Sequence, residues 1–116
     1  MIDKIIKEYL DGKYILQGKI PKPVTDWLEW SKWYSNINNR IVKKTDLPND
    51  VRVSTVFLGM DHSFGYFMNN ESNNHTPILF ETMIIGGEHD GYCDRYATWE
   101  QAEQGHEDAI NLIFEV

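Results

Sequence analysis

The end of the chain carries an amphipathic helix with a well-marked start. Thr98 followed by Gln101 fits the capping box, in which these two residue types cap each other's backbone amides. Apolar residues then recur at helical spacing from Trp99 to Ile113. Because a helix with one apolar stripe must pack on another layer, the rest of the chain has to supply that layer.

Four segments ahead of this helix have the apolar and β-branched composition of strands. They cover residues 40–47, 51–58, 77–85 and 92–97. Residues 48–50 are typical of a tight turn, and residues 59–76 are predicted to form a long polar loop. The predicted fold is therefore α+β, with a four-stranded antiparallel sheet over residues 40–97 packed by a C-terminal helix over residues 98–113.

The first 40 residues are predicted to form one or two helices. Residues 2–10 have apolar positions at helical spacing, and a second helix is expected to begin at Lys22-Pro23. The apolar arc of the second helix contains three tryptophans and is wider than one core-facing stripe needs. We therefore expect Trp33, with Tyr34 beside it, to be partly exposed and to anchor a partner. The alternative is that these aromatic residues belong to the core.

Composition narrows the class of protein. The 116 residues are 41% apolar and 25% charged, as in a folded globular domain, and we expect a single domain over residues 1–116. The one cysteine, Cys93, excludes an internal disulfide and favours a reducing, intracellular setting. The apolar runs are too short to span a bilayer, and the first residues lack the apolar region of a signal peptide. No membrane association is expected.

Charge is distributed unevenly along the chain. Residues 81–116 contain nine acidic residues and one basic residue, a net charge of −8, whereas residues 1–80 carry +1. Such a surface repels nucleic acid and suits a basic partner. The acidic residues of the last helix that we expect to meet this partner are Glu100, Glu103, Glu107 and Asp108. The alternative is a solvated helix face whose charge only aids solubility.

Two histidines and a carboxylate occur where polar residues are unexpected. His106 lies on the apolar stripe of the last helix, Glu81 in the middle of the most apolar strand, and His62 just after a strand. Buried groups of this kind need hydrogen-bond partners or a metal ion. Two imidazoles and a carboxylate suit zinc, with Asp61, Cys93 or water as the fourth ligand. The alternative is a hydrogen-bonded His–Glu–His network without metal.

Three blocks of the sequence resemble a family of small phage-encoded proteins with the pattern STVFLGxDH…FETM…TWExAExGH. The blocks are VSTVFLGMDH at residues 53–62, PILFETM at residues 77–83 and YATWEQAEQGH at residues 96–106. The resemblance covers about residues 51–113 and centres on the same candidate metal ligands. Most members of the family have no assigned activity, and at least one looks like a metal-containing anti-CRISPR protein.

The resemblance implies an inhibitor that acts by binding rather than an enzyme. It implies that the chain, in the host cytoplasm, binds a type II CRISPR effector nuclease and blocks target-DNA loading with its acidic surface. A structural zinc ion held by His62, Glu81 and His106 would then stabilise the domain. One alternative is a small zinc-dependent hydrolase with Asp61 or Glu103 as general base. The other is a phage structural or assembly protein without metal.

Overall fold

The computed structural model describes residues 12–63 and 76–115. Its elements in chain order are β1 (Tyr14–Gln17), β2 (Ile20–Pro23), α2 (Trp27–Ser35), the 3-10 helix η1 (Ile37–Asn39), β3 (Ile41–Leu47), β4 (Val51–Phe57), β5 (Phe80–Ile85), β6 (Cys93–Tyr96) and α4 (Trp99–Phe114). The helix expected over residues 2–10 lies outside the described residues, as does the tip of the loop expected over residues 59–76.

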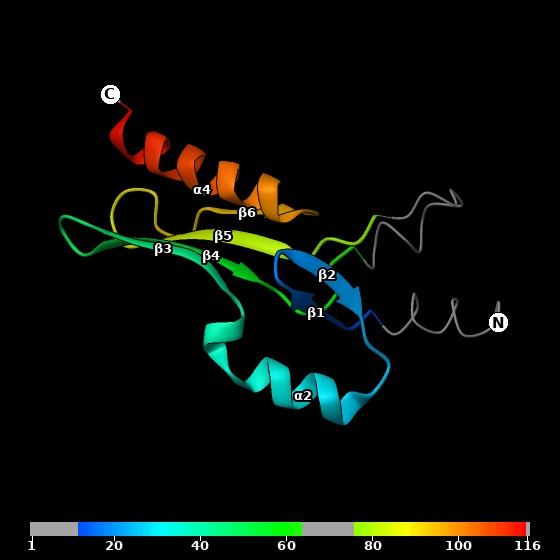
Figure 1. Ribbon diagram of the computed structural model, residues 1–116. Coiled ribbons are helices and arrows are strands. Elements are labelled where there is room, and N and C mark those ends of the chain that lie inside the picture. Colours follow the sequence, from blue (N-terminus) through cyan, green and yellow to red (C-terminus); the bar gives the residue numbers. More distant parts are fainter. Residues whose placement is uncertain (1–11, 64–75, 116) are drawn as a thin grey trace.

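Strands β3 to β6 form one antiparallel sheet in the order β3-β4-β5-β6, and α4 lies across one face of it (Figure 1). The α+β prediction is confirmed. The face under α4 is built by three cross-strand pairs of β4 and β5, which are Val53 with Ile84, Thr55 with Thr82 and Phe57 with Phe80. All six side chains are completely buried. Alternation along the strands sends the residues between them to the opposite face, which we call the open face.

Helix α4 begins where the capping box predicted. The Thr98 side chain accepts a hydrogen bond from the Gln101 backbone amide at 3.1 Å, and the Gln101 side chain accepts one from the Thr98 amide at 3.2 Å. The buried residues of the helix follow one stripe, comprising Ala102, Gly105, His106 and Ala109. This stripe places small side chains and one imidazole on the buried strand pairs.

The N-terminal region contains a β-hairpin where the sequence predicted the start of a helix. Strands β1 and β2 pair around Gly18-Lys19, and Gly18 takes a φ of 62°, which glycine adopts without strain. Lys22 and Pro23 end β2 instead of beginning a helix. Helix α2 begins only after Asp26, whose carboxylate accepts hydrogen bonds from two amides of the first turn. Pro23 gave the misleading signal, because proline favours both helix starts and edge strands.

Candidate functional site

His106 lies fully buried between α4 and the sheet, where it joins a chain of threonine hydroxyls. Its Nε2 atom is 2.8 Å from Thr45 Oγ1, and its Nδ1 atom is 2.7 Å from Thr55 Oγ1. Thr55 Oγ1 is in turn 2.6 Å from Thr82 Oγ1. A neutral imidazole has one donor and one acceptor nitrogen, and hydroxyls can take either role. Both ring nitrogens are therefore satisfied without a metal ion.

Burial holds the pKa of His106 below its usual value, and the nearby positive charge of Lys43 lowers it further. The ring is therefore neutral at neutral pH. Its role in this geometry is to pin α4 to β3 and β4 through hydrogen bonds. The expected network of histidines and Glu81 is corrected here, since the partners of His106 are threonines.

Glu81 lies on the open face, away from His106. Its carboxylate accepts a hydrogen bond from Arg95 Nε on the neighbouring strand at 2.9 Å, and 14% of its side chain is exposed. The Glu81 carboxylate is thus largely shielded from solvent, and its partner is a cation. Cys93 is beside this pair, and burial raises the pKa of its thiol, with a further rise from the Glu81 charge. A raised pKa keeps the sulfur protonated at neutral pH, which does not suit a nucleophile.

Asp61 and His62 follow β4 and have different surroundings. Asp61 Oδ1 accepts hydrogen bonds from the Ser63 amide at 2.8 Å, the Ser63 hydroxyl at 2.6 Å and the Ile78 amide at 2.9 Å. It thereby ties together the two chain segments that flank residues 64–75. His62 is exposed, and its Nδ1 donates to the Met60 carbonyl at 2.8 Å. Asp61 therefore acts as a local anchor of backbone structure.

The five candidate metal ligands do not converge. Within residues 12–63 and 76–115, no three His, Cys, Asp or Glu side chains are placed to hold one metal ion. His106 and Glu81 project from opposite faces of the sheet, because Glu81 alternates with Thr82, the neighbour that reaches the His106 network. The zinc site expected from His62, Glu81 and His106 with Asp61 or Cys93 is thus not formed by these side chains. They do not fit zinc.

The acidic residues of α4 lie on its outer side. Glu100, Glu103, Glu107 and Asp108 are all exposed, and we call them the acidic face. Glu107 forms an ion pair with Lys43 Nζ at 2.8 Å, and this hydrogen bond lowers the pKa of the Glu107 carboxyl. Lys43 alternates with Thr45 along β3 and pairs with Thr55, so it lies on the face of the sheet that α4 covers. The other three carboxylates form no ion pair with a cation of the described chain.

Trp33 and Tyr34 are packed into the molecule. The Trp33 ring meets the Phe57 ring edge-on at 5.6 Å between centroids, and Tyr34 stacks on Trp30 at 4.6 Å. Both side chains are half-buried, in agreement with the partial exposure predicted for Trp33, and their role as anchors for a partner stays a prediction. Trp27 and Leu28 of the same helix are 65% and 56% exposed.

The exposure of Leu28 could have been predicted from a helical projection that begins at the observed N-cap, Asp26. At 100° per residue, Leu28 points roughly 160° away from the mean direction of Trp30, Trp33 and Tyr34. The prediction instead began the helix at Lys22-Pro23 and treated its apolar residues as one continuous arc.

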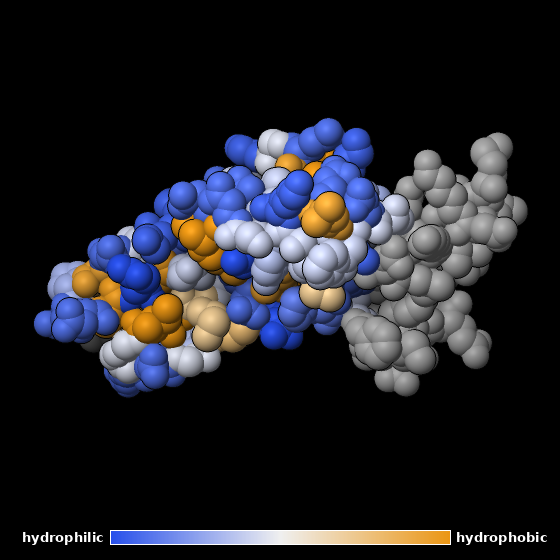
Figure 2. Space-filling view, turned by 90° about the horizontal axis from the view of Figure 1, so that it is seen from below, coloured by the Kyte–Doolittle hydropathy of each residue, from blue (hydrophilic) through white to orange (hydrophobic). Residues whose placement is uncertain are grey.

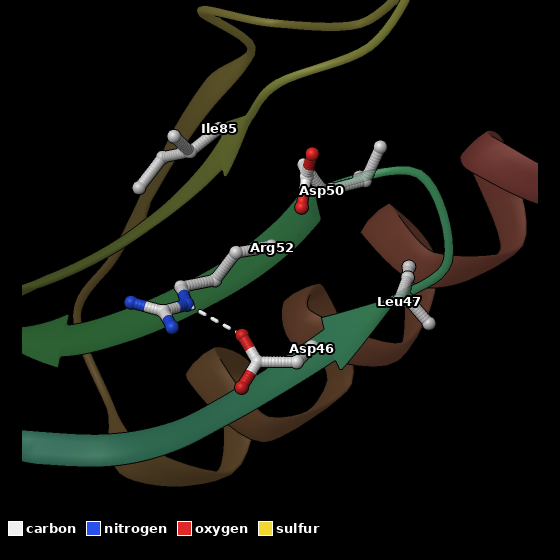
Figure 3. A pocket seen from close by; sticks show the side chains of 6 residues that line it. Asp46, Leu47, Asp50, Arg52 and Ile85 are labelled. Carbon is white, nitrogen blue, oxygen red and sulfur yellow. Dashed lines mark hydrogen bonds and ion pairs between the residues drawn. The ribbon is translucent and has the colours of Figure 1, made fainter.

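An open hollow at the β3–β4 turn was not predicted. It has a volume of about 410 Å³ and is lined by Asp46, Leu47, Asp50, Val51, Arg52 and Ile85 (Figure 3). Arg52 Nε donates to Asp46 Oδ1 at 2.6 Å, and this hydrogen bond lowers the pKa of the Asp46 carboxyl. Figure 2 views the molecule from the side opposite α4, where apolar patches lie among hydrophilic residues. Sequence reasoning missed the hollow because its lining residues come from three strands and a turn.

Comparison with known proteins found no match. No family model, curated protein or solved structure matches the chain. None of the helices in the described part of the chain combines the length and the apolar character needed to cross a membrane.

Proposed function

We propose that the chain is a protein-binding module whose acidic face binds a basic surface of a partner protein. The observation that carries this proposal is a row of exposed carboxylates on a helix whose opposite side is buried against the sheet. Glu100, Glu103 and Asp108 form no ion pair within the described residues, so their charges are available to a partner. Asp108 Oδ1 accepts one hydrogen bond, from Gln104 of the same helix at 2.9 Å. Carboxylates presented from a fixed helix steer a basic partner and set the register of docking.

The partner proposed is a type II CRISPR effector nuclease, as the sequence resemblance implies. Such a nuclease holds its guide–target duplex in a positively charged channel and recognises that duplex through its backbone. An acidic protein surface in the channel would compete with the phosphates of the target DNA. The inhibitor would thus act before DNA loading and would need no catalysis of its own.

A metal-dependent hydrolase has weaker support. Catalytic zinc needs ligands that converge and leave one open position. His106 has both ring nitrogens bonded to threonines, and Glu81 is bonded to Arg95. Zinc is therefore not part of the proposal.

The test is a DNA cleavage assay with a guide-loaded type II effector nuclease. We expect the wild-type chain to inhibit cleavage when it is added before the target DNA and to lose that effect when it is added afterwards. The variant Glu100→Lys/Glu103→Lys should inhibit about tenfold more weakly, because reversed charges meet a like-charged surface. The matched control Glu29→Lys/Glu88→Lys changes the net charge equally at exposed positions away from α4 and should inhibit like the wild type.

Two results would contradict the proposal. If the wild-type protein has no effect on DNA cleavage, the nuclease is not its partner. If Glu100→Lys/Glu103→Lys inhibits cleavage as strongly as the wild type, the acidic face is not the binding surface. Circular dichroism of each variant checks that α4 is retained, since Glu100 lies in its first turn.

A further inference from the structure

A line of polar side chains crosses the core beneath α4. Each of the strands β3 to β6 contributes one side chain and α4 contributes the imidazole, and we call the set the polar seam. Its members are Thr45, Thr55, Thr82, Tyr96 and His106. Hydrogen bonds of 2.6–2.8 Å join the three threonines and the imidazole into one chain.

The polar seam separates the apolar core into two clusters. One cluster contains Tyr14, Phe57, Leu79, Phe80 and Ala102, and the other contains Val53, Ile84 and Ala109. Along α4, β4 and β5 alike, the seam residue lies between a member of one cluster and a member of the other. The middle of α4 therefore rests on polar atoms rather than on a continuous apolar layer.

The middle of α4 also has little apolar side chain of its own to hold it on the sheet. Three of its four buried residues are Ala102, Gly105 and Ala109. The fourth, His106, is the largest side chain of the helix that is completely buried. The larger apolar side chains of α4 lie toward its two ends and are only partly buried. Because apolar stabilisation scales with buried apolar area, attachment of the middle of α4 depends on the hydrogen bonds of the imidazole.

The Tyr96 hydroxyl closes one end of the polar seam. It is buried against Gly105 and has no well-aligned hydrogen-bond partner within the described residues. Burial raises the pKa of the phenol, and the neighbouring Thr82 hydroxyl opposes that rise. A buried hydroxyl hydrogen needs an acceptor, so Tyr96 donates toward Thr82. Thr82 then donates to Thr55, and Thr55 donates to Nδ1 of the imidazole, which leaves the ring hydrogen on Nε2.

A second proton on the imidazole disrupts this order. Nδ1 becomes a donor, so Thr55 has to accept, and the direction of donation reverses along the polar seam. The Tyr96 hydrogen is then left without an acceptor at the closed end. The proton also places a positive charge on a completely buried ring, which costs free energy.

The charged groups near the ring do not offset this charge. Burial lowers the pKa of His106, Lys43 on β3 lowers it further, and Glu107 on α4 opposes them. The Glu107 carboxylate is itself bonded to Lys43 at 2.8 Å. Strands β4 and β5 present threonine hydroxyls to the ring. On β6, Asp94 pairs with Thr82 in the strand register but is exposed to solvent.

We propose that the polar seam is a pH-sensitive latch, which holds α4 on the sheet while His106 is neutral and loosens the helix when the ring takes up a proton. The latch needs no partner and is independent of the proposed function. If α4 also carries the surface that binds a partner, binding will weaken over the same pH range.

The first test follows α4 directly in the wild-type chain by NMR. Nitrogen–proton correlation spectra of the His106 ring should show the Nε2–H form at neutral pH. Amide hydrogen exchange, corrected for the intrinsic rate at each pH, should show that protection of α4 falls by up to about tenfold per pH unit as the pH falls through the pKa of His106. Protection of β4 and β5 should fall less, because the hydrogen bonds between these strands do not involve the ring. Equal losses in α4 and the strands, or no change in α4, overturns the latch.

A second test removes the titrating group. His106→Gln keeps a hydrogen-bond donor and an acceptor but cannot take up a proton, so α4 should stay protected at low pH. His62→Gln makes the same change at an exposed histidine and should behave like the wild type. Loss of α4 protection in His106→Gln over the same pH range as in the wild type overturns the latch.

A third test changes the charge beside the ring and leaves the polar seam intact. Lys43→Gln removes the nearby positive charge and the ion-pair partner of Glu107, so α4 should lose protection at a higher pH than in the wild type. Lys44→Gln removes the same charge from the next residue, which points to the opposite face of the sheet, and should not move this pH. If both lysine variants match the wild type, His106 is not the group that titrates and the latch is overturned. All three tests use the chain alone, so their failure leaves the proposed function to be decided by the cleavage assay.

Discussion

His106 connects three parts of the fold through one side chain. Its two nitrogens reach Thr45 on β3 and Thr55 on β4, while its backbone belongs to α4. A buried polar group that loses its partner costs about 1–3 kcal/mol, so each member of this network depends on the others. The network also makes the imidazole sensitive to pH, because protonation places a charge in a buried site.

We expect the protein to lose stability as pH falls from about 7 to about 5, in part through His106. The pKa of His106 in the folded protein lies below that of an ordinary histidine, so the unfolded chain binds a proton in a pH range where the folded chain does not. The stability due to the neutral ring is complete above the unfolded pKa and is lost as pH falls through the folded pKa. One group can contribute at most about 1.4 kcal/mol per pH unit. Urea unfolding at several pH values measures this slope.

The variant His106→Leu tests whether His106 contributes to the pH dependence of stability. It should be less stable than wild type at neutral pH by about 1–3 kcal/mol, because the threonines lose a partner, and its slope between about pH 5 and pH 7 should be smaller. His62→Ala removes an exposed imidazole and should leave the slope unchanged. An unchanged slope in His106→Leu would assign the pH dependence to other groups.

Helix α4 sits close to the sheet because Gly105 faces β6. A Cβ atom at this position would collide with the phenol ring of Tyr96. Glycine within a helix normally costs about 1 kcal/mol relative to alanine. Here that cost is offset by the room it leaves for the tyrosine, which packs against the cluster of Phe57 and Phe80.

We therefore expect Gly105→Ala to destabilise the protein by about 1–3 kcal/mol, although alanine is the better helix former. Thermal or urea unfolding measures the change. The smaller side chain of Tyr96→Leu should restore part of the loss in the double variant, which a helix-propensity effect could not do. At the exposed neighbouring position, Gln104→Ala should be close to neutral. Stabilisation by Gly105→Ala would contradict this account of the packing.

The whole molecule is strongly asymmetric in charge. Residues 81–116 carry a net charge of −8, and the part of this charge that lies on α4 faces outward. The open face carries Arg52 and Arg95, each bonded to a carboxylate, so its charge is nearly balanced. A basic partner is therefore attracted to the helix side more than to the middle of the open face.

Association with the proposed nuclease should weaken with salt. Raising the sodium chloride concentration from about 50 mM to about 500 mM shortens the screening length severalfold, and we expect the dissociation constant to rise by about tenfold or more. Fluorescence anisotropy of the labelled chain with the guide-loaded nuclease measures this. An affinity that does not change over this range would point to an apolar interface, for which Trp27 and Leu28 are the exposed candidates.

Local signals in the sequence determined the elements whose formation depends on nearby residues. The capping residues Thr98 and Gln101 predicted the start of α4, and apolar and β-branched composition predicted the four strands within a few positions. Outward exposure of the acidic face followed from its place opposite the apolar stripe. The β1–β2 hairpin was missed, because β2 contains prolines and Pro23 suits a helix start equally well.

Only the tertiary structure decided which side chains meet. Strand register puts Thr55 and Thr82 beneath His106, and alternation turns Glu81 to the other face, where Arg95 binds it. The hollow likewise exists only because the β3–β4 turn and the ends of three strands come together. Spacing in the chain carries no information on these contacts, since each joins residues from separate elements whose relative placement follows from packing the whole core.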